Sequence, residues 1–450
     1  MDAFNENSNE QQEQQPMGCL HRFSKTIKVV IIGLLILLLM IPMFMIENLI
    51  SERGRTQEEA IDEVSEKWSL AQTITGPYLN LQYPVVTENN GEKKVSIKDL
   101  ILFPDELMVN GQLKTEILKR SIYEVNVYQS ELTLKGSFSS EELKKSRIDM
   151  DQLQFDRAAI CLNLTDMRGI SEQISITLGD SVYIFEPGMD NRGIANTGVH
   201  AIANLSELKQ NKKLPYEIKI KLKGSQSLNF IPLGKTTRVD LKANWNTPSF
   251  TGNYLPNNRN ITEKEFSAQW QVLNLNRNYS QVMADYNTSN IKDIENSSFG
   301  VNFKIPVEQY QQSMRSAKYA ILIILLTFGV IFFTEIMNKT RIHALQYLLV
   351  GLALCLFYSL LLSFSEHIGF NPAYLLSSAL TIILVGGYMF GITKKKKPSL
   401  IMSGLLGILY LYIFVLIQLE TFALLAGSLG LFIILAMVMY FSKKIDWFNE

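Results

Sequence analysis

Few residues in this chain have the types and spacing that catalysis or metal binding requires. The sequence contains no GxxxxGK[ST] phosphate loop, GxSxG nucleophile turn, HExxH zinc motif, CxxC pair or GxGxxG turn after a strand. Its four histidines, His21, His200, His343 and His367, are far apart along the chain. Since a reactive site needs several such groups together, we expect no enzymatic activity, no catalytic residue, no metal site and no cofactor.

Two places have part of the pattern of a site. Asp149, Asp151 and Asp156 alternate like the ligands of a calcium loop, but the glycine and the terminal glutamate of that loop are missing. We interpret them as solvated carboxylates. His200 is the single histidine of the central region, and we expect it in a turn or strand with its ring bonded to a backbone carbonyl.

The best candidate for a binding face is the segment WNTPSFTGNYLP, residues 245–256, which concentrates aromatic side chains among turn residues. Trp245, Phe250, Tyr254 and the nearby Arg259 are of the residue types that dominate protein interfaces. The alternative interpretation is that these aromatics close the end of a β-sandwich core. The sequence leaves both interpretations open.

A candidate pH-sensitive pair, Glu366 and His367, lies at the end of an apolar segment. Histidine titrates near neutral pH, so this pair could sense the pH outside the membrane. Glu335 and Glu420 also lie at segment ends, and the apolar segments carry no Asp, Lys or Arg near their centres. Because an ion or proton pathway normally needs a polar group near the midplane, this pattern disfavours transport.

Six long apolar segments must position these residues, one near the N-terminus and five in the last third of the chain. Each segment is long enough to cross about 30 Å of hydrocarbon as a helix. We predict transmembrane helices over residues 27–46, 317–337, 344–364, 372–392, 399–419 and 421–441. The predicted fold class is a membrane α-helical protein with one N-terminal anchor and a bundle of about five helices.

Polar and small residues inside the bundle are expected to serve helix packing. Hydroxyl and thiol side chains can hydrogen-bond between helices, and glycines allow close approach. The polar residues are Thr327, Cys355, Tyr358, Ser359, Ser377, Ser378 and Thr381, and the glycines are Gly351, Gly386 and Gly404. A permeation path is the alternative interpretation of the same residues.

Basic residues beside the segments predict the orientation in the membrane. With a cytoplasmic N-terminus, Lys339 with Arg341, Lys394–Lys397, and Lys443 with Lys444 all fall on the cytoplasmic side. The turns at residues 365–371 and 418–420 contain no lysine or arginine. We therefore expect a bacterial inner-membrane protein with both termini cytoplasmic and residues 47–316 outside the cytoplasm.

Residues 47–316 are predicted to form a periplasmic β-rich domain that starts with a helix. Residues 55–75 have helical spacing, and Gly76-Pro77 is expected to end that helix, which should dock on a sheet. The hydrophobic period then changes to two, in runs such as SIYEVNVYQSELTLKG (121–136) bounded by turn residues. Many short runs of this kind indicate an antiparallel sandwich or a pair of sheets.

The termini and the composition limit the remaining possibilities. Residues 1–26 begin with an Asn, Gln and Glu-rich stretch predicted to be disordered and end in a basic flank, while residues 442–450 form a cytoplasmic tail. The chain has 43 Lys and Arg against 43 Asp and Glu, so we expect no nucleic-acid binding. Cys19, Cys161 and Cys355 fall in different regions, which leaves no disulfide partner within the central domain.

Several long stretches in one order resemble the CreD family of bacterial inner-membrane proteins. They include residues 315–370, GPYLNLQYP (76–84), residues 121–138, DMRGI (166–170), FEPG (185–188), GVHA (198–201) and residues 245–261. The resemblance implies one N-terminal anchor, a periplasmic domain and a C-terminal multi-helix bundle. It also implies a link to cell envelope integrity and to a regulon under a two-component system, but it carries over no catalytic residue and no cofactor.

Three functions are compatible with the sequence. The first is a non-enzymatic inner-membrane protein for envelope integrity and stress response, with a β domain that binds a periplasmic protein, a lipid or a cell-wall component. The second is a transporter or lipid-handling protein whose β domain binds the cargo. The third is an inward-signalling sensor, for which the short cytoplasmic segments offer only partner contacts.

Overall fold

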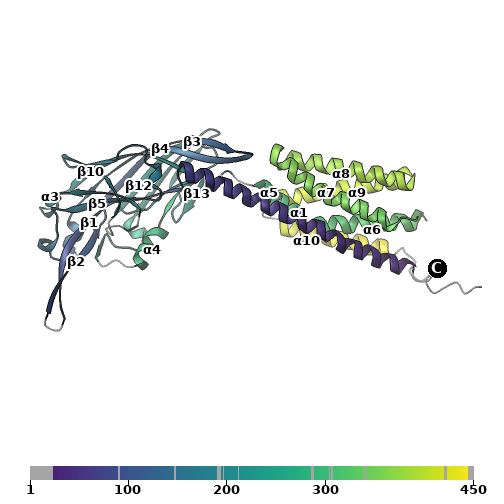
Figure 1. Cartoon of the computed structure of the whole chain (residues 1–450), viewed down its shortest axis with the longest axis horizontal. Coiled ribbons are helices and arrows are strands. Elements are labelled where there is room, and N and C mark those ends of the chain that lie inside the picture. The colour runs from purple at the N-terminus through teal and green to yellow at the C-terminus, as the bar shows by residue number, and fades with distance from the viewer. Residues whose placement is uncertain are drawn as a thin grey trace, which may run out of the picture. The chain divides into compact units, whose positions relative to one another are not determined.

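The computed structural model describes residues 24–89, 92–145, 148–189, 194–195, 197–210, 212–284, 288–303, 305, 308–338, 341–419 and 423–443. The chain divides into two compact units (Figure 1). The membrane unit comprises residues 1–56 and 307–450, and the β unit comprises residues 57–306. Of the predicted N-terminal segment at residues 1–26, residues 1–23 lie outside the described residues, as do Lys339, Glu420 and the tail from Lys444 onward. Residues 24–26 were predicted to lie before the first helix, but they belong to it.

Helix α1 runs without a break over Ser24–Trp68. It contains the predicted anchor and most of the predicted second helix, and it continues past Pro42. The prediction that Gly76-Pro77 ends this helix was wrong, because strand β1 (Gln72–Asn89) runs through those residues. The pairing of β1 with β5 (Ala158–Leu164) shifts its register between Thr75 and Tyr78, so the proline lies at an irregularity where a strand tolerates it.

The predicted docking of the helix on a sheet is confirmed. Near its end, Trp68 Nε1 donates a hydrogen bond to the carbonyl oxygen of Tyr128 at 3.5 Å. The ammonium group of Lys223 lies 4.9 Å from the centre of the Trp68 ring, a cation–π contact. Both partners belong to strands of the β unit, so the last turn of α1 packs on that unit.

The β unit contains two sheets among its described residues. The first has the strand order β13 (Ser249–Gly252), β17 (Phe299–Asn302), β11 (Ser227–Phe230), β1, β5, β9 (Gly198–Ala203) and β8 (Glu186–Pro187), with β2 (Glu92–Leu102) paired to both β1 and β16 (Val282–Ala284). The second has the order β14 (Asn258–Ile261), β15 (Phe266–Leu273), β12 (Thr236–Ala243), β3 (Glu106–Arg120), β4 (Tyr123–Phe138), β10 (Leu214–Ser225), β6 (Ser175–Leu178) and β7 (Ser181–Ile184).

Most of these strand pairs are antiparallel, as expected, but two are parallel. Strand β1 pairs in parallel with β11, and β12 pairs in parallel with β3. Parallel neighbours need a long crossover connection, and both partners here are far apart in the sequence. A sequence period cannot reveal which distant strands become neighbours, so these pairs were not predicted.

The main core lies between the two sheets. Strand β10 shows the expected alternation, with Ile218 and Ile220 buried while Lys219 and Lys221 are exposed. Strand β5 is buried at every residue because its two faces contribute to different clusters. Ile160 and Leu162 belong to the core between the sheets, whereas Cys161 belongs to a second cluster on the other face.

Short helices connect and cover the sheets. The connection at residues 139–153 contains α2 (Glu141–Lys145) and the 3-10 turn η2 (Met150–Gln152). Helix α4 (Thr288–Asn296) contributes Ile294 to the second cluster. The remaining short elements are η3 (Met167–Gly169), α3 (Ser206–Lys209) and η4 (Asn274–Asn276).

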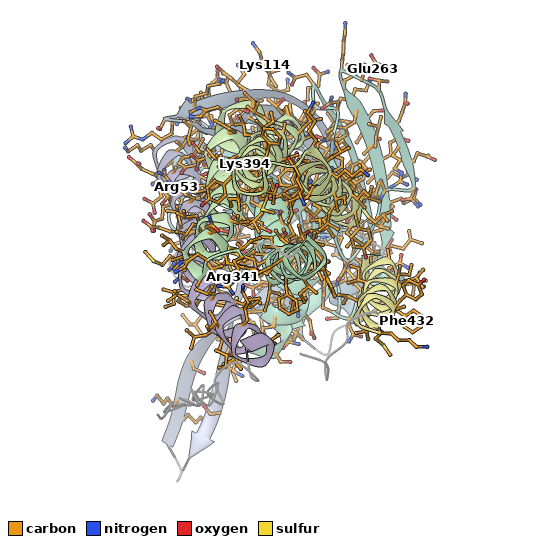
Figure 2. The ribbon with its side chains drawn as sticks, turned by 90° about the vertical axis from the view of Figure 1, so that its right-hand side faces the viewer. Arg53, Lys114, Glu263, Arg341, Lys394 and Phe432 are labelled. Atoms are coloured by element: carbon orange, nitrogen blue, oxygen red, sulfur yellow. The ribbon has the colours of Figure 1, made fainter. Side chains whose placement is uncertain are left out.

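The membrane unit contains, besides the start of α1, helices α5 (Glu308–Lys318), α6 (Ala320–Asn338), α7 (Ala344–Ile368), α8 (Phe370–Thr393), α9 (Lys396–Gln418) and α10 (Ala423–Ser442). Four helices of the described chain are long and apolar enough to cross a membrane, or five if α5 and α6, which meet at a 41° bend, count as one span. Helix α10 has a shorter apolar stretch of described residues, Leu425–Ala436. Helix α8 ends with Lys394 in the left-handed conformation, a common way to close a helix. Lys394 is labelled in Figure 2.

Two of the three predicted packing glycines lie at close helix contacts. A Cβ on Gly351 of α7 would lie 2.2 Å from Leu39 Cδ1 of α1, and one on Gly386 would lie 2.2 Å from Ser403 Oγ of α9. The prediction for Gly404 was wrong, since a Cβ there would have no neighbour within 4 Å.

Hydrogen bonds between the helices come mainly from residues that were not singled out in the sequence. The Tyr374 hydroxyl of α8 donates to the carbonyl of Tyr410 on α9 at 2.9 Å, and Ser399 Oγ donates to the carbonyl of Gly386 at 2.7 Å. Thr381, by contrast, bonds the carbonyl of Ser377 in its own helix. Hydroxyl groups on helices can satisfy their own backbone, so residue type alone does not predict a bond between helices.

Candidate functional site

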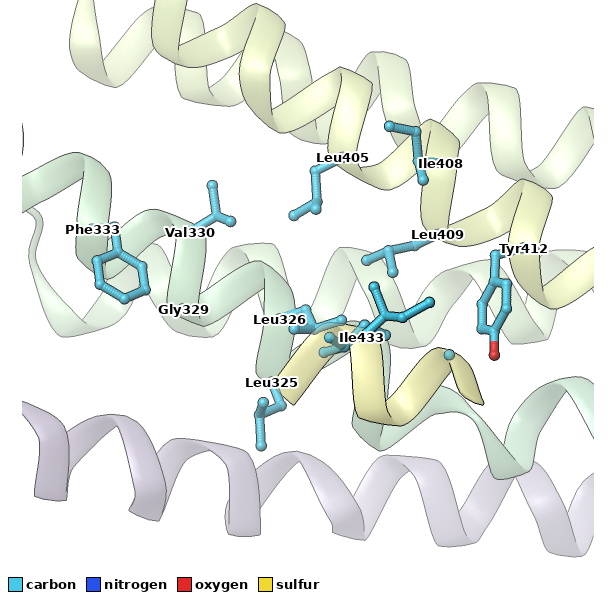
Figure 3. Close-up of a pocket in the computed structure, with 12 residues that line it drawn as sticks. Leu325, Leu326, Gly329, Val330, Phe333, Leu405, Ile408, Leu409, Tyr412 and Ile433 are labelled. Atoms are coloured by element: carbon cyan, nitrogen blue, oxygen red, sulfur yellow. The ribbon is translucent and has the colours of Figure 1, made fainter. Parts of the chain in front are cut away.

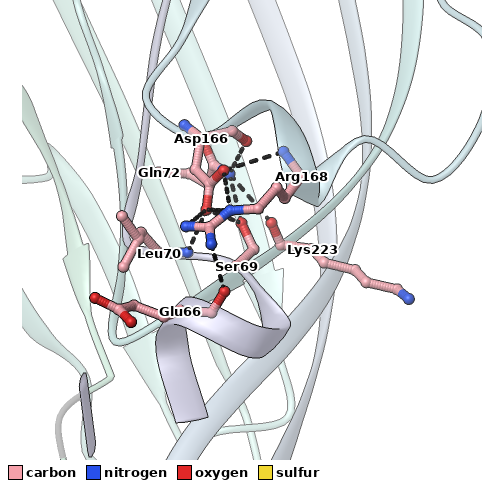
Figure 4. A network of polar contacts seen from close by, with 7 residues as sticks. All are labelled: Glu66, Ser69, Leu70, Gln72, Asp166, Arg168 and Lys223. Carbon is pink, nitrogen blue, oxygen red and sulfur yellow. Dashed lines mark hydrogen bonds and ion pairs between the residues drawn. The ribbon is translucent and has the colours of Figure 1, made fainter. Parts of the chain in front are cut away.

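A polar network lies at the end of α1 in the described β unit (Figure 4). At its centre is Asp166, a buried residue that begins the turn η3. Its Oδ2 accepts hydrogen bonds from the backbone N–H of Leu70 at 2.9 Å and from Ser69 Oγ at 3.4 Å. Its Oδ1 accepts from the backbone N–H of Arg168 at 3.0 Å. One carboxylate therefore joins the exit of α1 to a turn far along the chain.

Arg168 completes the end of the helix. Its guanidinium contacts Asp166 through Nε at 2.9 Å and through Nη2 at 2.9 Å, while Nη1 donates to the carbonyl of Glu66 at 2.6 Å. The last carbonyls of a helix lack partners within the helix and carry a partial negative charge. Arg168 satisfies one of these carbonyls and places a positive charge where the helix dipole favours it.

Gln72 links the network to the second sheet. Its Nε2 donates to the carbonyl of Asp166 at 2.7 Å and lies 3.4 Å from the carbonyl of Lys223, and its Oε1 accepts from the backbone N–H of Asp166 at 3.2 Å. Gly169 packs so closely that a Cβ there would lie 2.3 Å from the Lys223 carbonyl. A side chain at position 169 would thus force the turn away from the strand.

The electrostatics of the network favour the charged form of Asp166. Burial raises the pKa of this carboxyl group, but the hydrogen bonds from Arg168 and Leu70 outweigh burial, so the net pKa is below its usual value. The same contact raises the pKa of Arg168. Because both carboxylate oxygens of Asp166 are engaged in these hydrogen bonds, the network is suited to holding the end of α1 in place rather than to proton transfer.

We expect Asp166→Asn to destabilise the β unit by about 2–4 kcal/mol, because it removes the charge that balances Arg168 and weakens several buried hydrogen bonds. Trp68, Trp245 and Trp270 all lie in this unit, so tryptophan fluorescence of the full-length protein in detergent reports its unfolding. Glu172→Gln removes the carboxylate of an exposed pair with Lys221 and should leave the melting temperature unchanged. Equal effects of the two variants would contradict this role for Asp166.

The same variant should alter the pH dependence of stability. A carboxyl group with a lowered pKa in the folded state adds stability above its unfolded pKa of about 3.9, and that stability is lost as the pH falls through the folded value. The wild-type melting temperature should therefore drop more steeply below about pH 4 than that of Asp166→Asn. Parallel curves for the two proteins would count against the assignment.

Two residues of the predicted binding face, Phe250 and Tyr254, contact the same aromatic cluster of the core. Phe250 packs edge-on against Phe266 and Trp270, with ring centres 5.8 and 5.6 Å apart. Tyr254 packs edge-on against Phe299, and its hydroxyl donates to the carbonyl of Asn276 at 2.8 Å.

The other two residues of this set differ in exposure. Trp245 is half-buried against the core and donates to the carbonyl of Thr247, whereas Arg259 is exposed on β14. The three aromatics thus contact the core, the arrangement described above for closing residues, and a binding role for the set stays a prediction.

An open cavity of about 380 Å³ lies beside this set. It is lined by Tyr254, Leu255, Asn257, Gln271, Leu273 and Asn276. Leu255 is 66% exposed and the neighbouring Leu275 is 88% exposed.

Arg277 is a residue that the sequence analysis missed. Its guanidinium donates to the carbonyls of Tyr279 and Leu233 and lies 4.3 Å from the centre of the Tyr279 ring. Burial lowers the pKa of Arg277. An arginine in a polar segment gives no sequence signal that it will be half-buried, because most of its partners are backbone carbonyls.

In the membrane unit, Glu335 joins three helices. The Lys28 ammonium of α1 forms an ion pair with Glu335 of α6. Glu335 also accepts hydrogen bonds from the backbone N–H of Ile342 at 3.2 Å and from the Tyr347 hydroxyl of α7 at 3.2 Å. The sequence places Glu335 at the end of an apolar segment. In the structure its carboxylate has structural partners at the ends of α1, α6 and α7.

A second carboxylate holds α1 further along its length. Glu366 on α7 accepts a hydrogen bond from the Tyr310 hydroxyl of α5 at 3.0 Å and lies 3.8 Å from Arg53 Nε of α1. Lys28 and Arg53 are 25 residues apart on one helix, about 38 Å, close to the thickness of a bilayer with its headgroups. His367 is exposed. The pH-sensitive role of Glu366 and His367 stays a prediction.

We expect Lys28→Met to destabilise the membrane unit by about 1–3 kcal/mol, because it leaves the Glu335 carboxylate without its cation. The double variant Lys28→Met with Glu335→Gln should recover much of that loss, since no unpaired charge remains. Thermal loss of the monodisperse peak in detergent size-exclusion chromatography measures both. The exposed Lys396→Met is the matched control. A double variant no more stable than Lys28→Met would exclude the ion pair as the cause.

The remaining sequence candidates have structural partners. His200 Nδ1 lies 2.7 Å from the carbonyl of Gly188, which confirms the expected backbone contact. Asp149 Oδ1 accepts from the backbone N–H of Asp151, and Asp151 pairs with Lys209 at 2.6 Å. No group of three or more metal-binding side chains occurs within the described chain.

Comparison with known proteins gives two matches that cover most of the chain. A family model described as "Inner membrane protein CreD" matches residues 24–448. The protein named "Inner membrane protein CreD" of Escherichia coli (strain K12) is 32% identical over 420 residues, which cover 92% of this chain and 91% of that protein. The similarity therefore includes the β unit as well as the helices.

Proposed function

The chain belongs to the CreD family of inner membrane proteins, and from this premise we propose that it is a non-enzymatic protein that supports cell envelope integrity under stress. In this proposal the β unit binds a periplasmic protein, a lipid or a cell-wall component, and the membrane unit holds the β unit at the outer face of the inner membrane. The observation that carries the proposal is the continuity of α1. One helix passes from the ion pairs of the membrane unit to the Asp166 network of the β unit.

Each end of α1 has polar partners in its own unit. The start of the helix is held in the membrane unit by the ion pair of Lys28 with Glu335. Its last turn is held in the β unit by the hydrogen bonds of Asp166 and Arg168.

We further propose that both termini are cytoplasmic and that residues 47–316 are periplasmic. The contact of Lys28 with Glu335 supports this orientation, because it groups the start of α1 with the end of α6, where Arg341 follows. These basic residues belong on the cytoplasmic side by the positive-inside rule.

Cysteine labelling in intact cells tests the orientation. In a background lacking the native cysteines, a membrane-impermeant maleimide should label Lys264→Cys, an exposed residue of the β unit, without cell lysis. It should label Lys396→Cys, in the lysine-rich connection before α9, only after lysis. The reverse pattern would overturn the proposed topology.

For the binding face, we propose that Arg259 and the exposed Leu255, which lines the cavity, contact the ligand. Arg259→Glu with Leu255→Ser should lower survival of a complemented deletion strain in detergent and osmotic shock, at unchanged melting temperature, because both side chains are exposed. Lys219→Glu with Val182→Ser, two exposed positions on β10 and β7, is the control. Full stress tolerance in the first variant would remove this face from the proposal.

The second candidate function is transport or lipid handling, with the β unit as the cargo-binding module. The observation that favours it is an apolar groove in the membrane unit, described below, which suits lipid better than an ion. This function would be favoured if substitutions in the groove lower stress tolerance while substitutions in the binding face do not. A link to a two-component system, through the connections on the cytoplasmic side, is the family-based alternative and predicts co-purification with a histidine kinase.

A further inference from the structure

Helices α6, α9 and α10 surround an apolar groove of about 370 Å³ within the membrane unit (Figure 3). Leu325, Gly329 and Phe333 of α6 form one side, Leu405 and Tyr412 of α9 a second, and Ile433 of α10 a third. Among the described residues that line it, only Tyr412 has a polar side-chain atom, and its hydroxyl donates to the carbonyl of Ala426 in α10 at 2.8 Å. The described lining therefore offers hydrocarbon contacts without a free polar group.

The depth of the groove limits what can reach it. Leu325 is five residues from the start of α6 at Ala320, and Phe333 is five residues from its end at Asn338. The lining residues of α9 and α10 are further from the ends of their helices. Five residues of helix are about 7.5 Å, so every lining residue lies within the depth of the hydrocarbon core when the helices span it. Water-soluble ligands do not partition to this depth.

Two kinds of hydrocarbon-phase occupant remain, a lipid chain and a further transmembrane helix. The lining residues of α6 run from Leu325 to Phe333, which is about 12 Å along the helix. A further transmembrane helix would pack along about 30 Å of hydrocarbon, so it needs a longer apolar surface than this groove offers. The volume of the groove is within the range of sites for small ligands, which begins at about 300 Å³. A single flexible chain therefore suits this groove better than a helix.

We propose that the groove binds one acyl chain of a membrane phospholipid. The edge of the groove is fixed by Tyr412, whose hydroxyl both bonds α10 and fills the place where a Cβ on Gly430 would lie. Phe432 and other large apolar residues of α10 face outward (Figure 2), so α10 presents hydrocarbon on its outer face as well. The inference concerns the membrane unit alone and does not depend on the ligand proposed for the β unit.

Gly329 provides the variant that tests this site. A Cβ at Gly329 would meet no atom within 4 Å, so Gly329→Leu adds its side chain to the groove without a clash. Gly404→Leu on α9 and Gly387→Leu on α8 are matched controls, because a Cβ at either place also meets no atom within 4 Å and neither residue lines the groove. Val330→Phe, which fills the groove from a neighbouring lining residue, is the second test variant.

The experiment uses the full-length protein in vesicles of phosphatidylethanolamine and phosphatidylglycerol with a small fraction of a phospholipid that carries a diazirine in its acyl chain. After illumination, mass spectrometry should locate adducts on groove residues of α6, α9 and α10 in the wild-type protein. Gly329→Leu and Val330→Phe should each lower these adducts severalfold, while Gly404→Leu and Gly387→Leu should leave them unchanged.

Two outcomes would overturn the proposal. Adducts spread evenly over the outer faces of all helices, and unaffected by Gly329→Leu, would mean that only ordinary surrounding lipid is present. Loss of a dimer in Gly329→Leu, measured by light scattering in detergent, together with copy-to-copy cross-links at groove positions, would mean that a second copy of the chain occupies the groove. A melting temperature like that of Gly404→Leu shows that Gly329→Leu is folded.

Discussion

The carboxylate of Asp166 is the constraint on which the β unit's attachment to α1 depends. A helix that ends against a sheet leaves carbonyls and neighbouring N–H groups without partners, and burying them unsatisfied is costly. Asp166 accepts from the N–H of Leu70, and the arginine that it holds donates to the carbonyl of Glu66. The same carboxylate begins the turn η3, whose glycine permits the close approach to the neighbouring strand.

Charged residues in the membrane unit also have structural partners. Lys28 with Glu335, and Arg53 with Glu366, hold α1 against the other helices at two places near the ends of a membrane-spanning length. Removing the cation of either pair leaves a glutamate side chain that is only 10–11% exposed without its partner. These contacts explain why the glutamates lie at segment ends, and they tie the position of α1 to the rest of the membrane unit.

The aromatic segment at residues 245–256 contributes both to the core and to the surface of the β unit. Phe250 and Tyr254 contribute to the core through edge-on contacts with Trp270 and Phe299, and Tyr254 also lines the cavity beside the exposed Leu255. An aromatic side chain is large enough for both, since one face can be buried while an edge or hydroxyl remains accessible.

Sequence by itself determined the properties that depend on local periodicity and hydropathy: the apolar helices, the β-rich middle region, the absence of known catalytic motifs and the family. Tertiary structure decided what depends on partners distant in the chain. The unbroken α1, the parallel pairing of β1 with β11, and the roles of Asp166, Arg277 and Glu335 all arise from contacts across many residues. Gly351 and Gly404 make the point at single positions, because both are glycines in apolar helices and only Gly351 meets a neighbouring helix. The physical reason is that a local pattern fixes which face of an element is apolar, while the opposing element and its polar groups are set by how the whole chain packs.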